Sequence, residues 1–146
     1  MVQQARLAFG AIQPFWAQVS YTDGRTLPRD RNDQHIHAEC EIYFNLSGDV
    51  SFMVEDRVYP ISPGSVILTR PYENHHCIYH SPALHRHFWV LFSCEGNEAY
   101  FPLFFDRAVG EGNLRVLSPE NTAALSALFY EMAERPLSPT EGYLLF

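Results

Sequence analysis

Short apolar runs alternate with turn-forming residues between His35 and Phe92. The runs are rich in β-branched and aromatic residues and span residues 42–46, 50–54, 66–68, 77–79 and 88–92. Groups such as Ser47-Gly48-Asp49 and Ser62-Pro63-Gly64 separate them. Because breaks at this spacing leave room for strands but not for helices, the pattern predicts several hairpins in series that form a sandwich or a small barrel.

A different pattern begins at Ser118. This serine can cap a helix, Pro119 suits the first helical turn, and apolar residues follow at positions 125, 128, 129 and 132. We predict an amphipathic helix that ends near Glu134 and is stopped by Pro136. Its apolar stripe can serve either as a dimerisation surface or as a lid on the barrel.

A second helix start follows, with Ser138 as its cap and Glu141 completing a capping box. The sequence ends at Phe146, within the first turn of this helix. Because one turn is not stable by itself, we expect the chain to be a fragment of a longer protein.

These patterns divide the chain into three parts. Residues 1–34 form an N-terminal arm and connector, in which residues 21–34 are polar and rich in turn formers. Residues 35–117 form the β-barrel, and residues 118–146 form the helical segment. A length of 146 residues with 47% hydrophobic residues is typical of one folded domain.

The net charge of the chain excludes some classes of binding partner. The chain has 10 basic residues, all of them arginine, against 17 acidic ones, for a net charge of -7. Such a chain should not by itself bind nucleic acid or an anionic membrane surface. The first twenty residues fit neither a signal peptide nor a membrane span, so we expect a cytoplasmic protein. Its three cysteines have no metal-binding spacing and indicate buried thiols in a reducing compartment.

Candidate chemistry gathers in the histidines, all seven of which lie between residues 35 and 87. On an extended strand His35, His37 and Glu41 leave from one face. With His75 from a distant turn they make a suitable ligand set for Zn, Ni, Mn or Fe(II). His76 is out of register by one position, so only one of this histidine pair should point inward.

The flanking positions give a conflicting signal. The even-numbered residues from Ile36 to Leu46 are all apolar or small, so plain alternation would bury them and turn the histidines and Glu41 toward solvent. A bulge would reconcile the two patterns, and so would a sheet buried on both faces by an inner cavity and an outer helix.

Three runs of residues resemble a known family. His35-Ile-His-Ala-Glu-Cys-Glu-Ile-Tyr-Phe-Asn-Leu-Ser-Gly48 is similar to the first cupin motif, and Gly64-Ser-Val-Ile-Leu-Thr-Arg-Pro-Tyr-Glu-Asn-His75 is similar to the second, with Glu73 where glycine is often found. Together with Arg86-His-Phe-Trp-Val-Leu-Phe92, they resemble the N-terminal sensor domain of AraC/XylS-type transcription regulators over about residues 35–135.

The resemblance implies a mainly β fold, a cupin-like jelly-roll barrel followed by one or more C-terminal α-helices. It also implies a barrel cavity that holds a small-molecule effector, helices that pair two subunits, and a helix-turn-helix DNA-binding domain after this chain. The protein would then contact DNA only through that missing domain.

The resemblance also suggests contacts for the effector. In sugar-sensing members the positions that match His87 and Trp89 contact the ligand, and an indole with an imidazole suits a sugar. Trp89 as plain core is the alternative. His35, His37, Glu41 and His75 can hold a divalent metal, contact the effector, or simply bond within the protein. His80 and His85 flank the Ser81-Pro82 turn and are expected to be solvated.

Two functions therefore compete. The first is an effector-binding and dimerisation domain without catalytic residues. The second is a metal-dependent cupin enzyme, a dioxygenase or isomerase, that uses the three-His-one-Glu set with an open coordination position. A stand-alone interaction module with a filled barrel is a weaker third hypothesis.

Overall fold

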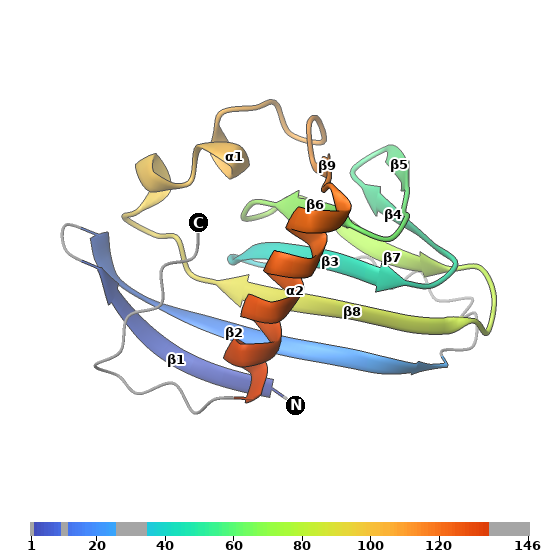
Figure 1. The fold of residues 1–146 in the computed structure, drawn as a ribbon. Helices are drawn as coiled ribbons and strands as arrows, with labels where there is room; N and C mark the ends of the chain where they lie inside the picture. Colours follow the sequence, from blue (N-terminus) through green and yellow to red (C-terminus); the bar gives the residue numbers. More distant parts are fainter. Residues whose placement is uncertain (1, 10–11, 26–34, 135–146) are drawn as a thin grey trace.

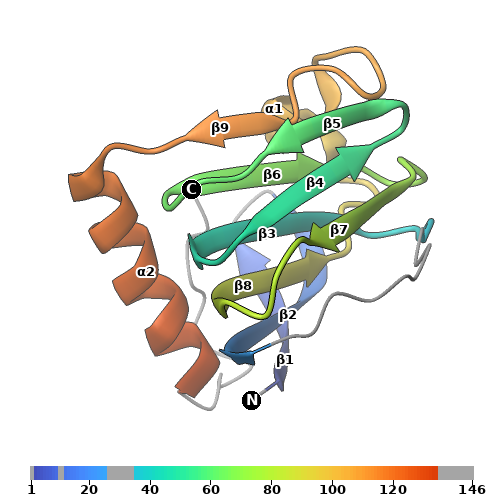
Figure 2. The same ribbon diagram turned by 90° about the vertical axis from the view of Figure 1, so that its right-hand side faces the viewer.

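Two antiparallel sheets dominate the computed structural model, which describes residues 2–9, 12–25 and 35–134 (Figures 1 and 2). The larger sheet has the strand order β1 (Val2–Phe9), β2 (Ile12–Arg25), β8 (Leu84–Phe92), β3 (Cys40–Ser47), β6 (Ser65–Thr69) and β9 (Leu114–Val116). The smaller has the order β5 (Arg57–Pro60), β4 (Val50–Val54) and β7 (His75–Tyr79). This confirms the predicted mainly β, cupin-like barrel.

The helices follow the barrel strands. A 3-10 turn, η1 (Glu98–Tyr100), and the short α1 (Pro102–Phe105) come directly after β8, and α2 (Pro119–Glu134) comes after β9. The hydroxyl of Ser118 accepts a hydrogen bond from the backbone N–H of Asn121 at 3.1 Å, which confirms the predicted cap. In the ranges that the structure describes, no helix combines the length and apolarity needed to cross a bilayer.

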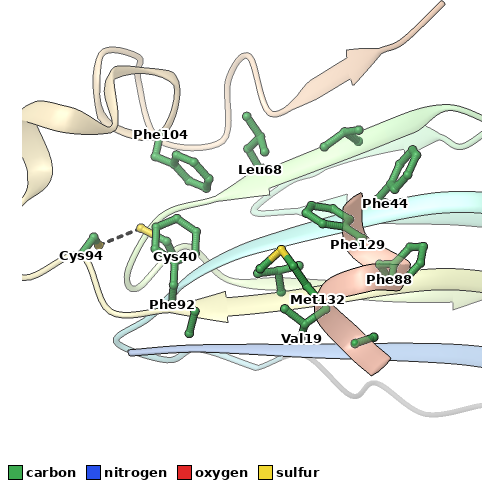
Figure 3. Close-up of a cluster of buried hydrophobic side chains, with 14 residues drawn as sticks. Val19, Cys40, Phe44, Leu68, Phe88, Phe92, Cys94, Phe104, Phe129 and Met132 are labelled. Carbon is green, nitrogen blue, oxygen red and sulfur yellow. Dashed lines mark hydrogen bonds between the residues drawn. The ribbon is translucent and has the colours of Figure 1, made fainter. Parts of the chain in front are cut away.

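The β3 strand is buried on both faces, which resolves the conflict in its pattern. Its inner face, toward the smaller sheet, carries Tyr43, which packs with Phe52 of β4. Its outer face carries Phe44, which packs against Phe88 of β8 and Phe129 of α2 (Figure 3). The odd-numbered residues therefore face the barrel interior, while α2 covers the even-numbered ones.

The α2 helix lies across the outer face of the larger sheet (Figure 1). Phe129, Met132 and Ala133 are buried in the core cluster on that face. Tyr130 donates a hydrogen bond from its hydroxyl to the hydroxyl of Tyr21 on β2 at 2.8 Å. The apolar stripe thus acts as a lid on the sheet, although Leu128 stays 56% exposed.

The N-terminal part of the chain differs from expectation. A loop was predicted from residue 21, but β2 continues to Arg25 and pairs with β8 along that length. Such long-range pairing overrides the turn-forming preference of Asp23 and Gly24. Residues 26–34, and the second helix predicted from Ser138, lie outside the described residues.

Candidate functional site

Four side chains converge at one end of the barrel interior. Glu41 is the second residue of β3, and His75 is the first residue of β7. His35 forms an isolated antiparallel bridge with His75, with backbone N–H to carbonyl distances of 3.2 and 3.3 Å. From Oε2 of Glu41, the Nε2 atoms of His37, His75 and His35 lie 3.1, 3.3 and 3.9 Å away. The structure therefore selects His75 over His76 for this group.

Hydrogen bonds to backbone carbonyls fix the orientation of two of these imidazole rings. Nδ1 of His75 lies 2.7 Å from the carbonyl oxygen of Glu73, and Nδ1 of His37 lies 3.1 Å from that of Glu39. A carbonyl only accepts, so each Nδ1 carries a proton. Nε2 then faces Glu41 as a second N–H donor in a protonated ring and as a lone pair in a neutral one. Lone pairs and a carboxylate that face one another require either protonated rings or a shared cation.

The donor set fits a divalent transition metal. One donor atom from each of His35, His37, Glu41 and His75 lies within 4.8 Å of the others. Atoms bonded to one ion at about 2.1 Å lie at most about 4.2 Å apart, so a small inward movement of these side chains would let all four share an ion. Nitrogen and carboxylate donors suit Zn, Ni, Fe or Mn. The carbonyl bonds to Nδ1 of two histidines are the second-shell contacts that orient imidazole ligands.

The charge of Glu41 follows from its burial and its hydrogen bonds. Burial by itself would raise the pKa of Glu41, but hydrogen bonds from His35, His37 and His75 outweigh it and hold that pKa well below the usual range. Oε1 of Glu41 is buried and has no hydrogen-bond partner within the described part of the chain. A carboxylate in this state retains charge and a free oxygen for a ligand.

A second polar group lies further along the inner face of β3 and β8. Strand pairing sets Tyr43 opposite Trp89 and Asn45 opposite His87. The ring of Tyr43 lies 4.6 Å from that of Trp89 and 5.1 Å from that of His87. Its hydroxyl donates to Oδ1 of Asn45 at 3.0 Å. His87 and Trp89 therefore lie on the same inner face of the barrel.

Two buried nitrogens of this group make no hydrogen bond within the described part of the chain. Nδ2 of Asn45 and Nδ1 of His87 accept or donate no hydrogen bond among the described residues. Burial, and secondarily the proximity of His85, lowers the pKa of His87 to about 4, so its ring is neutral near pH 7. Such atoms cost free energy unless a ligand or water satisfies them.

The prediction that His85 is solvated is wrong, whereas His80 is exposed as expected. His85 is fully buried, with Nε2 3.0 Å from the carbonyl oxygen of Ser81. Gly48 has φ +128°, and a Cβ added there would meet Nδ1 of His85. The turn after β3 therefore covers this ring, and a side chain at position 48 would displace it.

A buried ion pair supports the turn that leads to His75. Glu73 is 1% exposed and binds Arg107 through both carboxylate oxygens, at 2.6 and 2.7 Å. It also accepts bonds from the backbone N–H groups of Arg70 and Gly110. Burial by itself would raise the pKa of Glu73. These hydrogen bonds, of which the one from Arg107 contributes most, outweigh burial and lower the pKa to about 2. They fasten the loop after α1 onto the turn that positions the histidine.

An apolar cavity of about 430 Å³ lies outside the barrel. It sits on the outer face of the larger sheet, bordered by α1, α2 and β9. Its lining includes Leu68, Phe92, Phe104, Leu125, Phe129 and Met132. Leu103 and Leu128, each more than half exposed, also line this cavity.

A family model that matches most of the chain shows the family to which it belongs. The model described as the AraC-like ligand binding domain matches residues 20–141. The chain belongs to this family. An AraC-like ligand-binding domain of cupin type supports a role in effector binding. No curated protein matches the sequence.

Solved structures with a similar fold include a dioxygenase and a cupin barrel protein. The salicylate 1,2-dioxygenase of Pseudaminobacter salicylatoxidans is 22% identical, with a TM-score of 0.41 over 53% of this chain and 21% of that chain. AerE of Microcystis aeruginosa is 14% identical, with a TM-score of 0.43 over 61% and 45%. A cupin 2 conserved barrel protein of Salinispora arenicola is 16% identical, with a TM-score of 0.43 over 68% and 82%. This chain thus spans less than half of the dioxygenase and AerE, and these low scores transfer no activity to it.

Sequence reasoning missed part of the AraC-like interior. Thr22 stands opposite His87 and Thr69 stands opposite Glu41 in the larger sheet. The hydroxyl of Thr69 is buried with no bond to any other described residue. Pairing between distant strands brings both threonines to the inner face, and neither local motifs nor spacing could reveal it.

Proposed function

We propose that this AraC-like domain is the small-molecule effector-binding and dimerisation domain of a cytoplasmic transcription regulator. It would control a DNA-binding domain outside this chain. The observation that carries the proposal is the pair of buried nitrogens on His87 and Asn45, which have no hydrogen-bond partner among the described residues and lie beside aromatic rings on the inner face. A ligand that satisfied them would bind at the centre of the barrel.

The chemistry of this group favours a neutral polyol, such as a sugar. The rings of Tyr43 and Trp89 offer flat apolar faces, which stack on the C–H face of a sugar ring. Asn45 Nδ2 can donate to a hydroxyl, and a neutral His87 can either donate or accept there. The side chains of Tyr43, Tyr79, Trp89 and Asn45 beside His87 carry no positive charge, so they give no cationic partner for an anionic ligand.

A divalent metal is the proposed cofactor of the neighbouring group. His35, His37, Glu41 and His75 would hold it, and when bound it supplies a Lewis acid that binds an oxygen atom of a ligand. Phe52 connects the two groups, because its ring lies 6.0 Å both from that of His75 and from that of Trp89. A metal would thus lie at one end of the proposed effector site.

Dimerisation is proposed through the apolar cavity and α2, with a second copy of this chain as the occupant. Leu128 on α2 and Leu103 on α1 are exposed beside a cavity whose lining is almost entirely apolar. Large exposed apolar patches on a soluble domain mark interaction surfaces. Leu128→Glu should convert a dimer to a monomer in sedimentation velocity, and an unchanged dimer would exclude this surface.

The effector proposal is tested by a thermal-shift screen of neutral pentoses, hexoses and related polyols. A ligand at ~100-fold above its dissociation constant stabilises the folded state by about 2.7 kcal/mol. We expect at least one compound to raise the thermal midpoint of wild-type protein, with no shift in His87→Phe. A screen in which no polyol shifts the wild type would contradict the assignment of ligand class.

The four-residue group also favours a second candidate function, a metal-dependent cupin enzyme. Its buried Glu41 and three imidazoles would provide the ligands, and open coordination positions would bind substrate. Turnover by the metal-loaded protein that disappears in Glu41→Gln would favour the enzyme. Effector binding without any turnover of the bound compound would favour the regulator.

A further inference from the structure

Two cysteine thiols meet in the outer core of the larger sheet. Sγ of Cys40 and Sγ of Cys94 lie 2.8 Å apart, and the two residues are 0% and 2% exposed (Figure 3). Both are free cysteines. The two thiols are separated by 54 positions in sequence, so the fold alone brings them together.

Strand register explains the contact. Cys40, at the start of β3, pairs with Phe92 at the end of β8, and Cys94 follows two positions later on the same face. Diagonal neighbours of this kind are within reach of each other across antiparallel strands. A disulfide needs its sulfurs at about 2.0 Å, so little movement separates this thiol pair from a bond.

We propose that Cys40 and Cys94 are a modification site, at which a hydroperoxide such as hydrogen peroxide forms a reversible intramolecular disulfide. One thiolate attacks the peroxide O–O bond, so that a sulfenic acid forms and water leaves. The Cys40 thiol then attacks that sulfur, so that the S–S bond forms, the S–O bond breaks, and the departing hydroxyl group takes the thiol proton and leaves as a second water. Two thiols and one peroxide thus give one disulfide and two waters.

The surroundings suit this reaction. Cys94 is followed at once by the exposed residues Glu95 and Gly96, so only a surface turn separates it from solvent. The S–H of Cys40, donated to Cys94, holds the pKa of Cys94 below its ordinary value, which favours Cys94 as the first nucleophile. A sulfenic acid formed there would already touch its resolving partner.

The bond would join two elements that matter to the barrel. Cys40 directly precedes Glu41, and Cys94 directly precedes the turn that leads to η1 and α1. Oxidation would lock the start of β3 to the end of β8 beside the apolar cavity, whose lining includes Phe92. A cross-link over such a long loop should stabilise the fold.

The remaining cysteine provides an internal control. Cys77 belongs to the inner cluster with Tyr43 and Phe52, and burial raises its pKa to about 12. It should therefore stay reduced at peroxide concentrations that oxidise the pair. Cys77→Ser leaves Cys40 and Cys94 as the sole thiols of the sequence.

The test exposes Cys77→Ser protein to hydrogen peroxide, denatures it and labels it with iodoacetamide before intact-mass analysis. We expect a mass lower by about 2 Da, no label, full reversal by dithiothreitol, and a thermal midpoint about 5–10 °C higher than in the reduced protein. The same treatment of Cys77→Ser/Cys94→Ser should give neither the mass loss nor the higher midpoint.

Three results would overturn the proposal: two iodoacetamide labels after peroxide, oxygen adducts without a disulfide, or a disulfide found only between chains. Peptide mapping of oxidised wild-type protein serves if a variant fails to fold. There, the expected result is a peptide that links Cys40 to Cys94 and a labelled Cys77, and two unlinked peptides would contradict the proposal.

Discussion

His75 turns a ring nitrogen toward the buried carboxylate of Glu41. Nε2 of His75 lies 3.3 Å from Oε2 of Glu41, while its Nδ1 faces the carbonyl oxygen of Glu73 at 2.7 Å. The carbonyl fixes one proton on Nδ1, so Nε2 can donate to the carboxylate only if the ring is protonated, and a neutral ring turns a lone pair toward it. A cation between them, with His35 and His37 as further ligands, removes the conflict.

Metal content is therefore the first prediction. Wild-type protein supplied with Zn, Ni, Fe and Mn salts should retain close to one transition metal per chain after exhaustive dialysis. Plasma mass spectrometry should find that metal lost in His35→Ala/His37→Ala. His80→Ala, which removes an exposed histidine, is the matched control and should retain it. Metal-free wild type after reconstitution would contradict a metal at this group.

The buried ion pair beside the site should dominate local stability. Removing one partner of such a pair leaves an uncompensated buried charge and typically costs about 3–5 kcal/mol. We expect Arg107→Met to lower the free energy of unfolding by that amount in urea titrations. The exposed pair of Arg57 with Glu111 at 3.0 Å is the control, and Arg57→Met should cost no more than about 1 kcal/mol. Equal effects of the two substitutions would contradict this account.

Acid should destabilise the domain partly through His87. Burial lowers its pKa to about 4, so the unfolded chain binds a proton at higher pH than the folded one. Stability linked to His87 is complete above its ordinary pKa of about 6.5 and falls as pH decreases toward 4, by up to about 3 kcal/mol. The groups that face it are His85, Tyr43, Tyr79, Trp89 and Asn45.

The comparison that isolates this effect is the pH dependence of unfolding in His87→Gln. Glutamine does not titrate, so the free energy of unfolding of His87→Gln should fall less between pH 6.5 and 4 than that of the wild type. His80→Gln changes an exposed ring whose Nε2 contacts Ser51 Oγ, and its profile should follow the wild type. Superimposable profiles for wild type and His87→Gln would show that His87 is not held neutral by burial.

Local signals in the sequence predicted the elements whose stabilising contacts are also local. The Ser118 cap, Pro119 and the spacing of Phe129 and Met132 fixed α2 at Pro119–Glu134, as the structure has it. The alternation in β3 correctly placed Glu41 and Tyr43 on one face. The pattern could not show which face was inside, because α2 buries the other one equally well.

Long-range contacts explain what the sequence did not predict. His85 flanks a turn and looked solvated, yet strand register and the bare backbone of Gly48 bury it. Glu73 stands where the cupin motif often has glycine, and its partner, Arg107, lies 34 positions further along the chain. Likewise, β9 has three residues, Leu114–Val116, and exists only because it pairs with β6. Periodicity carries no information on such partners.

The most direct measurement for the central claim, a polyol effector inside the barrel, is isothermal titration calorimetry of metal-reconstituted protein with the screened sugar. The account predicts one saturable site per chain in wild type and in Leu128→Ala, which alters only the outer surface. Binding should disappear in His87→Phe and in Trp89→Leu while circular dichroism shows both folded. Unchanged affinity in these two folded variants would contradict the claim and place the ligand elsewhere.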